Sequence, residues 1–179
     1  KCGIPIKVAA YSDDDGIFNS DNEYLKTIEK ARVKGISVLE QYDLNEHLLD
    51  MERDTLYLID KELSRYKKEK SMKDFTDLLI DFIEGDNCPS FDVLFIDEAQ
   101  DLSYLQWQMV RKMWEKSEKT YLAGDDDQAI FQWAGADIDH FIALKDEVDE
   151  IKVLEQSYRI PGGPIHELSQ RIIANVSNR

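Results

Sequence analysis

Three short apolar runs in the second half of the chain each end directly in a cluster of polar residues, and helical stretches separate the runs. The runs cover residues 93–96, 120–123 and 151–154. Short strands that alternate with helical crossovers predict a parallel sheet of the α/β class. In an open parallel sheet, ligands bind at the carboxyl ends of the strands. We therefore expect the three polar clusters to converge on one edge of the sheet and to form an active site there.

The first polar cluster starts with Asp97 and Glu98, after four apolar residues that predict a strand buried on both faces. Two adjacent carboxylates repel each other unless a positive group lies beside them. A magnesium ion needs only one or two carboxylates together with substrate phosphates, and the neighbouring carboxylate can then orient or deprotonate a water. The alternative, a simple helix cap, is less favoured because Asp101 and Ser103 offer a better N-cap.

The second polar cluster, residues 124–128, contains three consecutive aspartates. One interpretation is the Gly-Asp-Asp metal-binding turn of viral RNA polymerases, which needs a partner aspartate motif and a much longer chain. The interpretation that fits better places Asp125 and Gln128 at a phosphate site and leaves Asp126 and Asp127 in solvent.

Two aromatic residues, Phe131 and Trp133, follow this cluster at positions two apart. In an extended segment such residues point the same way, so both rings could line one groove. One interpretation is core packing. The other is that the exposed rings stack on nucleic-acid bases, at about 1–3 kcal/mol each.

The first half of the chain is expected to be helical between residues 20 and 84, whereas residues 1–20 give no clear pattern. The expected helices run from a capping box at 20–23 to a stop at Lys34 and Gly35, from about 45 to 70, and from about 73 to 84. The lysines at the end of the second helix are expected to be solvated.

Composition excludes several classes of protein. The formal net charge of −15 argues against a generic basic nucleic-acid coat and against binding to anionic membranes. Two cysteines make no disulfide framework and indicate a reducing compartment. The longest apolar run is too short to span a bilayer. We expect a cytoplasmic protein without a membrane partner.

Three stretches match a known pattern in order and spacing, and a fourth is similar to a part of it. They are Asp-Glu-x-Gln at the end of 91–100, Gly-Asp-x-x-Gln and the aromatic segment in 124–137, a Tyr-Arg pair in 154–159, and Asp-Phe-x-Asp-Leu in 74–79. Together they resemble the UvrD/Rep-like branch of superfamily 1 DNA helicases, particularly its shorter viral members. The resemblance covers roughly residues 55–175 and implies ATP and Mg²⁺ as cofactors, with a bacterial or phage-infected cell as the setting.

The resemblance implies roles for the residues at the expected sheet edge. Asp97 would hold magnesium, and Glu98 would activate the water that attacks the γ-phosphate. Gln100 and Gln128 would sense that phosphate and link it to domain movement, and Asp125 would belong to the nucleotide site.

The same resemblance implies roles for residues further along the chain. Arg159 would act as an arginine finger, and Tyr158 would stack on adenine. Phe131 and Trp133 would pack against bases of single-stranded DNA.

No Gly-x-x-x-x-Gly-Lys-Ser/Thr phosphate loop occurs in the sequence. We therefore expect the chain to be an internal fragment of a larger ATP-dependent DNA helicase and to be inactive alone. Its expected partners are single-stranded or duplex DNA and the missing remainder of the enzyme. Its parts are expected to be an uncertain segment (1–20), a helical insertion subdomain (21–85), the C-terminal half of a first RecA-like P-loop NTPase domain with a partial parallel sheet (86–160), and the start of a second (161–179). The alternative is a non-catalytic protein-interaction module built on a degenerate helicase fold.

Overall fold

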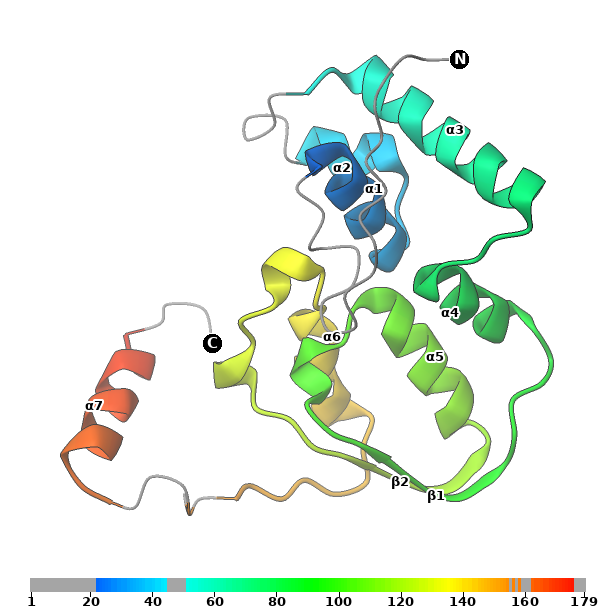
Figure 1. Ribbon diagram of the computed structural model, residues 1–179. Helices are drawn as coiled ribbons and strands as arrows, with labels where there is room; N and C mark the ends of the chain where they lie inside the picture. The colour runs from blue at the N-terminus through cyan, green and yellow to red at the C-terminus, as the bar shows by residue number, and fades with distance from the viewer. Residues whose placement is uncertain (1–21, 45–50, 155, 157, 159–161, 176–179) are drawn as a thin grey trace.

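The computed structural model describes residues 22–44, 51–154, 156, 158 and 162–175. These residues form a mixed α/β fold with one small parallel sheet. Its elements are α1 (Glu23–Val33), α2 (Val38–Leu44), α3 (Arg53–Lys70), α4 (Phe75–Glu84), β1 (Phe91–Ile96), α5 (Tyr104–Trp114), β2 (Ser117–Leu122), α6 (Ile138–Ala143) and α7 (Pro164–Ile173). Figure 1 shows α1–α3 together at one end, the two strands at the other, and α4 and α5 between them. The described helices include no candidate for a membrane span.

The first helix, α1, has nearly the predicted bounds but a different cap. Its N-cap is Asn22, whose side chain accepts hydrogen bonds from the backbone N–H groups of Tyr24 and Leu25 at 3.0 and 3.3 Å. The predicted cap, Ser20, lies outside the described residues. The helix ends before Gly35, which adopts a left-handed conformation with φ of 67°, as the Lys-Gly stop predicts.

The second predicted helix, from about 45 to 70, is too long. The structure has α2 ending at Leu44 and a separate α3 starting at Arg53, and residues 45–50 lie outside the described part. The backbone is extended at Glu52 (φ −82°, ψ 129°), which interrupts any helix that continues through this point. Helices α1–α3 enclose a core that includes Ile28, Ala31, Val38, Met51, Leu56 and Ile59.

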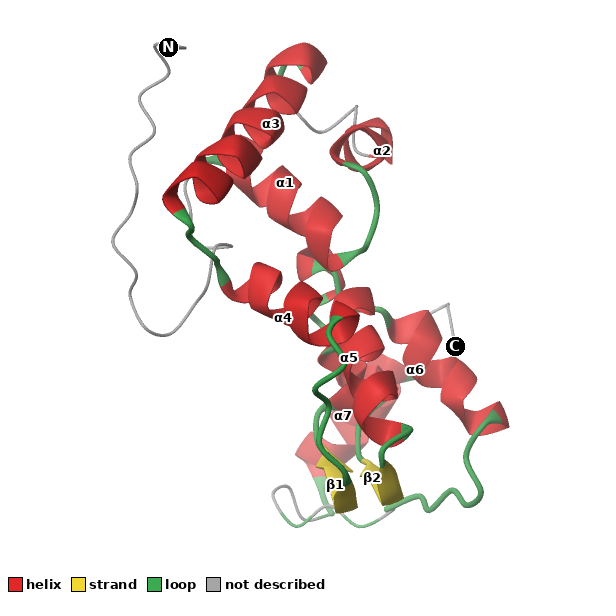
Figure 2. Cartoon of the chain, turned by 90° about the vertical axis from the view of Figure 1, so that its right-hand side faces the viewer, coloured by secondary structure: helices red, strands yellow, loops and turns green. Residues whose placement is uncertain are grey.

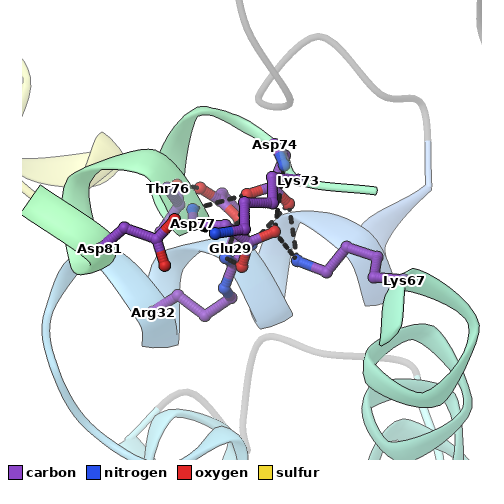
Figure 3. Close-up of polar contacts among 8 residues, drawn as sticks. All are labelled: Glu29, Arg32, Lys67, Lys73, Asp74, Thr76, Asp77 and Asp81. Carbon is purple, nitrogen blue, oxygen red and sulfur yellow. Dashed lines mark hydrogen bonds and ion pairs between the residues drawn. The ribbon is translucent and has the colours of Figure 1, made fainter. Parts of the chain in front are cut away.

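A group of charged side chains joins α1, α3 and the start of α4; we call Glu29, Arg32, Lys67, Asp74, Thr76 and Asp77 the charged cluster (Figure 3). Arg32 donates to both carboxylate oxygens of Asp74, at 2.8 and 3.1 Å, and to Asp77 at 2.6 Å. Lys67 reaches the same two carboxylates at 2.9 and 2.6 Å. Two cations therefore hold α4 against the other helices.

The charged cluster also sets the protonation of its carboxylates. Burial acts to raise the pKa of Asp74, but hydrogen bonds from Arg32 and Lys67 outweigh it and hold that pKa well below its usual range. Glu29 accepts from Arg32 at 2.9 Å and from the Thr76 hydroxyl. Asp74 also caps α4 in a reciprocal capping box with Asp77.

The predicted parallel sheet is confirmed for two strands and is wrong for the third. Strands β1 and β2 pair in parallel, with Phe91 opposite Ser117 and Ile96 opposite Leu122. Residues 151–154 form no strand. Leu154 is 92% exposed, and no described strand lies beside this segment to satisfy its backbone groups. A strand needs such a partner, whatever its local sequence.

Strand β1 was also expected to be buried on both faces, and this expectation is wrong. Ile96 packs against the cluster that holds the fully buried Trp107, and Leu94 is buried, whereas Phe95 on the other face is 74% exposed. Phe95 stacks on Tyr121 of β2 with ring centroids 5.1 Å apart. Alternate residues of a strand face opposite sides, and the described elements cover only one of them.

Candidate active site

The carboxyl ends of β1 and β2 meet at one edge of the sheet, as two parallel strands must. The Ala123 N–H donates to the Ile96 carbonyl at 2.8 Å, and the Ala99 N–H donates to the Ala123 carbonyl at 2.9 Å. These two bonds continue the strand pairing past the last strand residues. They bring the Asp97–Asp101 and Gly124–Gln128 segments side by side.

A buried side chain, Gln100, joins the two polar segments. Its Nε2 donates to Glu98 Oε2 at 2.8 Å, and its Oε1 accepts from the Asp125 N–H at 3.0 Å. Gln128 then donates through Nε2 to Asp125 Oδ2 at 2.5 Å. Because Gln100 is only 1% exposed and both ends of its amide are used, it fixes Glu98 and Asp125 relative to each other.

The backbone turns sharply between the strand and Gln100. Glu98 adopts a left-handed conformation (φ 50°, ψ 42°), which costs a non-glycine residue about 1–2 kcal/mol. Its N–H donates to Asp97 Oδ1 at 3.0 Å. Asp97 and Glu98 remain exposed while the next two residues are buried. Local strain of this kind collects at functional sites.

Gly124 makes room for this arrangement. A Cβ atom at Gly124 would lie 2.8 Å from Gln100 Oε1 and 2.8 Å from Phe141 Cζ. Any larger residue would therefore push Gln100 away from the Asp125 N–H. Sequence reasoning missed both this requirement and Phe141, which lies on α6 and reaches the edge only through the tertiary fold.

The site is acidic and has no cation of its own among the described residues. Asp97, Glu98 and Asp125 take part in none of the ion pairs in the described part of the chain. Burial, and next the charge of Glu98, raise the pKa of Asp101. The Oδ1 atom of Asp101 is buried and makes no hydrogen bond in the described structure.

These oxygens suit a hard cation such as magnesium, with one restriction. The described residues contain no group of three or more acidic, histidine or cysteine side chains placed to hold a metal together. The donor set therefore fits an ion held by one carboxylate and by oxygens of a bound phosphate. It does not fit a cage made only of protein ligands.

The aromatic residues Phe131 and Trp133 lie at the surface, which argues against the core interpretation. They are 42% and 62% exposed, with ring centroids 6.5 Å apart and planes tilted by 47°. The segment is not extended as expected, because Gln132–Ala134 form a 3₁₀ turn. The two rings are nonetheless neighbours on an open surface.

The third polar cluster, residues 155–159, follows a segment that forms no strand. Tyr158 is 86% exposed, and Arg159 lies outside the described residues. Within the described part of the chain, the structure joins the first and second clusters.

Comparison with known proteins identifies the family. The model of the UvrD/REP helicase N-terminal domain matches residues 6–149, which is most of the chain. The chain belongs to the UvrD/REP helicase family. The match includes the helical first half of the chain, whereas the motif resemblance covers only residues from about 55 to 175.

Individual family members show the same likeness. The chain is 30% identical over 121 residues to the ATP-dependent DNA helicase Rep of Buchnera aphidicola subsp. Baizongia pistaciae, a match covering 62% of this chain and 18% of that protein. It is 32% identical over 117 residues to the ATP-dependent DNA helicase PcrA of Bacillus subtilis, covering 59% and 16%. DNA helicase II of Haemophilus influenzae is 34% identical over 90 residues, covering 50% and 12%. The matched part spans less than a fifth of each of these UvrD/REP relatives.

Proposed function

We propose that this chain forms part of an ATP-dependent DNA helicase, which couples ATP hydrolysis to translocation on single-stranded DNA and to duplex unwinding. The observation that carries the proposal is a pair of hydrogen bonds made by the Gln100 side chain. It donates to the Glu98 carboxylate and accepts from the Asp125 N–H. It joins the ends of two parallel strands, where ligands of such sheets bind. The relatives named as ATP-dependent DNA helicases support the same activity.

In this proposal the edge binds the phosphates of ATP. Asp97 would hold a magnesium ion, which would neutralise developing phosphate charge. Glu98 Oε2 accepts from Gln100, so Oε1 is the oxygen that would take a proton from the attacking water. Gln128 would contact the γ-phosphate. Because Gln128 is hydrogen bonded to Asp125, a change in this contact would also affect Asp125.

Two further residues complete the proposed nucleotide site. Tyr158 would stack on adenine, and Arg159 would stabilise charge on the transferring phosphoryl group as an arginine finger. Both follow the segment after α6, beyond the residues matched by the family model.

The DNA contact in this proposal is stacking rather than charge. A net charge of −15 gives little binding by counterion release. Phe131 and Trp133 expose their rings and would stack on bases of a single strand, at about 1–3 kcal/mol each.

The same proposal assigns the architecture. Residues 21–85 would form a helical insertion, 86–160 the C-terminal half of a RecA-like ATPase domain, and 161–179 the start of a second such domain. The parallel pairing of β1 and β2 supports the middle assignment.

The test is Glu98→Gln in the complete protein that carries this sequence. ATP turnover with single-stranded DNA should fall by about 10²–10⁴-fold, because the general base is lost, while nucleotide binding persists. Glu84→Gln, at an exposed position on α4, is the matched control and should leave turnover unchanged. Normal turnover by Glu98→Gln would contradict the proposal.

A further inference from the structure

The C-terminal turn of α1 lies directly against the loop that carries Phe131 and Trp133; residues 131–135 are called the aromatic loop. Gly135 is buried and has a φ of 107°, a conformation that L side chains rarely adopt. A Cβ atom there would lie 2.9 Å from Val33 Cγ2 on α1. Because a β-branched side chain in a helix is held in one rotamer, Val33 cannot easily turn aside. Only glycine lets the loop approach α1 this closely.

A second glycine makes a comparably close contact, with the first residue of α5. Gly35, just past the end of α1, has a φ of 67°, and a Cβ atom there would lie 2.7 and 2.8 Å from Tyr104 Cε1 and Cδ1. Tyr104 is the first residue of α5. Figure 2 shows the end of α1 beside the start of α5, where the helical part of the chain meets the sheet part.

Backbone bonds connect these two contacts. Ser103 and Ala136 form an antiparallel bridge, and the Asp137 N–H donates to the Leu102 carbonyl at 2.8 Å. The Ala136 N–H donates to the Phe131 carbonyl at 3.2 Å, which closes the aromatic loop. The contacts therefore form a closed ring through Val33, Gly135, Ala136, Ser103, Tyr104 and Gly35.

We propose that this ring of contacts positions the aromatic loop, so that α1 sets the orientation in which Trp133 meets single-stranded DNA. Val33 and Gly135 are positioning residues in this account. The inference rests on the proposed role of Trp133 in base stacking. Apart from one 3₁₀ turn, the loop has no regular structure of its own, so its geometry depends on what it is packed against. A preformed orientation removes part of the ordering cost of binding.

The experiment measures binding of a labelled oligothymidylate and DNA-free ATP turnover in the complete protein. Gly135→Ala should weaken binding by about tenfold, because the added methyl group strains the backbone and meets Val33. DNA-free turnover should stay within about twofold. Val33→Ala combined with Gly135→Ala removes the steric contact and should recover about threefold of the affinity. Gly162→Ala, where an added Cβ meets nothing within 4 Å, is the matched control.

The outcomes separate this inference from the function on which it rests. If Trp133→Ala weakens DNA binding and Gly135→Ala does not, the positioning role is overturned and the stacking role of Trp133 stands. Trp133→Ala without effect overturns both. A Gly135→Ala loss that Val33→Ala does not relieve also contradicts the inference. If Gly135→Ala does not fold, Tyr104→Ala opens the ring without adding an atom and should weaken binding about threefold; unchanged affinity would then overturn the proposal.

Discussion

Two groups of carboxylates in this chain have opposite surroundings. In the charged cluster, Asp74 and Asp77 share Arg32 and Lys67, with N–O distances of 2.6–2.9 Å in the ion pairs. At the sheet edge, Asp97 and Glu98 form no ion pair within the described part of the chain; Asp97 accepts from the Glu98 N–H, and Glu98 accepts from the Gln100 amide.

The two regions also shift carboxylate pKa values in opposite directions. Hydrogen bonds from cations lower the pKa of Asp74 despite its burial, whereas burial and the charge of Glu98 raise the pKa of Asp101. Where the chain supplies its own cations, carboxylates hold helices together. Where it supplies none, the oxygens are available to a cation that arrives with a ligand. This contrast distinguishes the acids that hold the helices together from the acids that we propose to be functional.

The largest expected effect comes from breaking the charged cluster. Arg32→Ala removes the ion pair to Glu29 and leaves Asp74 and Asp77 with Lys67. It should lower the free energy of unfolding by about 3–5 kcal/mol, as for loss of one partner of a buried ion pair. Urea unfolding measures this. Arg65→Ala removes an arginine that also pairs with two carboxylates but is 61% exposed, and it should lower the free energy of unfolding far less than Arg32→Ala does. Equal losses would show that burial does not distinguish the two arginines.

A smaller effect is expected from the sheet edge. Gln100→Ala leaves the Asp125 N–H and the Glu98 carboxylate without their shared partner, and should cost about 1–3 kcal/mol of stability. ATP turnover of the complete protein should fall together with it, because Glu98 loses its fixed position. Turnover that is retained while stability drops would show that Gln100 only holds the two loops together.

The smallest expected effect is on how the free energy of unfolding depends on pH under acidic conditions. The folded-state pKa of Asp74 is lowered, so its contribution to stability is present above the unfolded value of about 3.9 and is lost as the pH falls below it. Asp74→Asn should remove this loss and flatten the dependence of unfolding free energy on pH, by up to about 1.4 kcal/mol per pH unit. Identical slopes below about pH 4 in both proteins would contradict the assigned cation contacts.

Elements with local signals could be predicted from the sequence. Ser103 caps α5 as expected, with Gln106 completing a capping box, and Gly85 ends α4. The interruption before α3 was missed because the backbone conformation at Glu52 leaves no strong local signal. The third strand was predicted wrongly at residues 151–154, because a strand forms only beside a pairing partner, and a run of four apolar residues does not show whether such a partner is present.

The acidic residues of the site could be predicted from the sequence, but the hydrogen bonds that connect them could not. Asp97, Glu98 and Asp125 were expected at one edge because parallel strands end together. The bridge by Gln100 uses the backbone N–H of Asp125, which no side-chain pattern reveals. Lys67 was expected to be solvated, and this is wrong, since its partners come from the next helix.

The central claim is that the carboxylates of the charged cluster stabilise the fold, whereas those at the sheet edge serve ATP turnover. A matched pair of substitutions tests this claim directly. Asp74→Asn and Asp97→Asn each remove one charge from one group, and both unfolding free energy and ATP turnover are measured for each variant of the complete protein. Asp74→Asn should lose about 3 kcal/mol of stability and keep its turnover per folded molecule. Asp97→Asn should keep its stability within about 0.5 kcal/mol and lose turnover by about a hundredfold or more. The account is contradicted if both variants lose stability alone, or if Asp97→Asn turns over ATP at the normal rate.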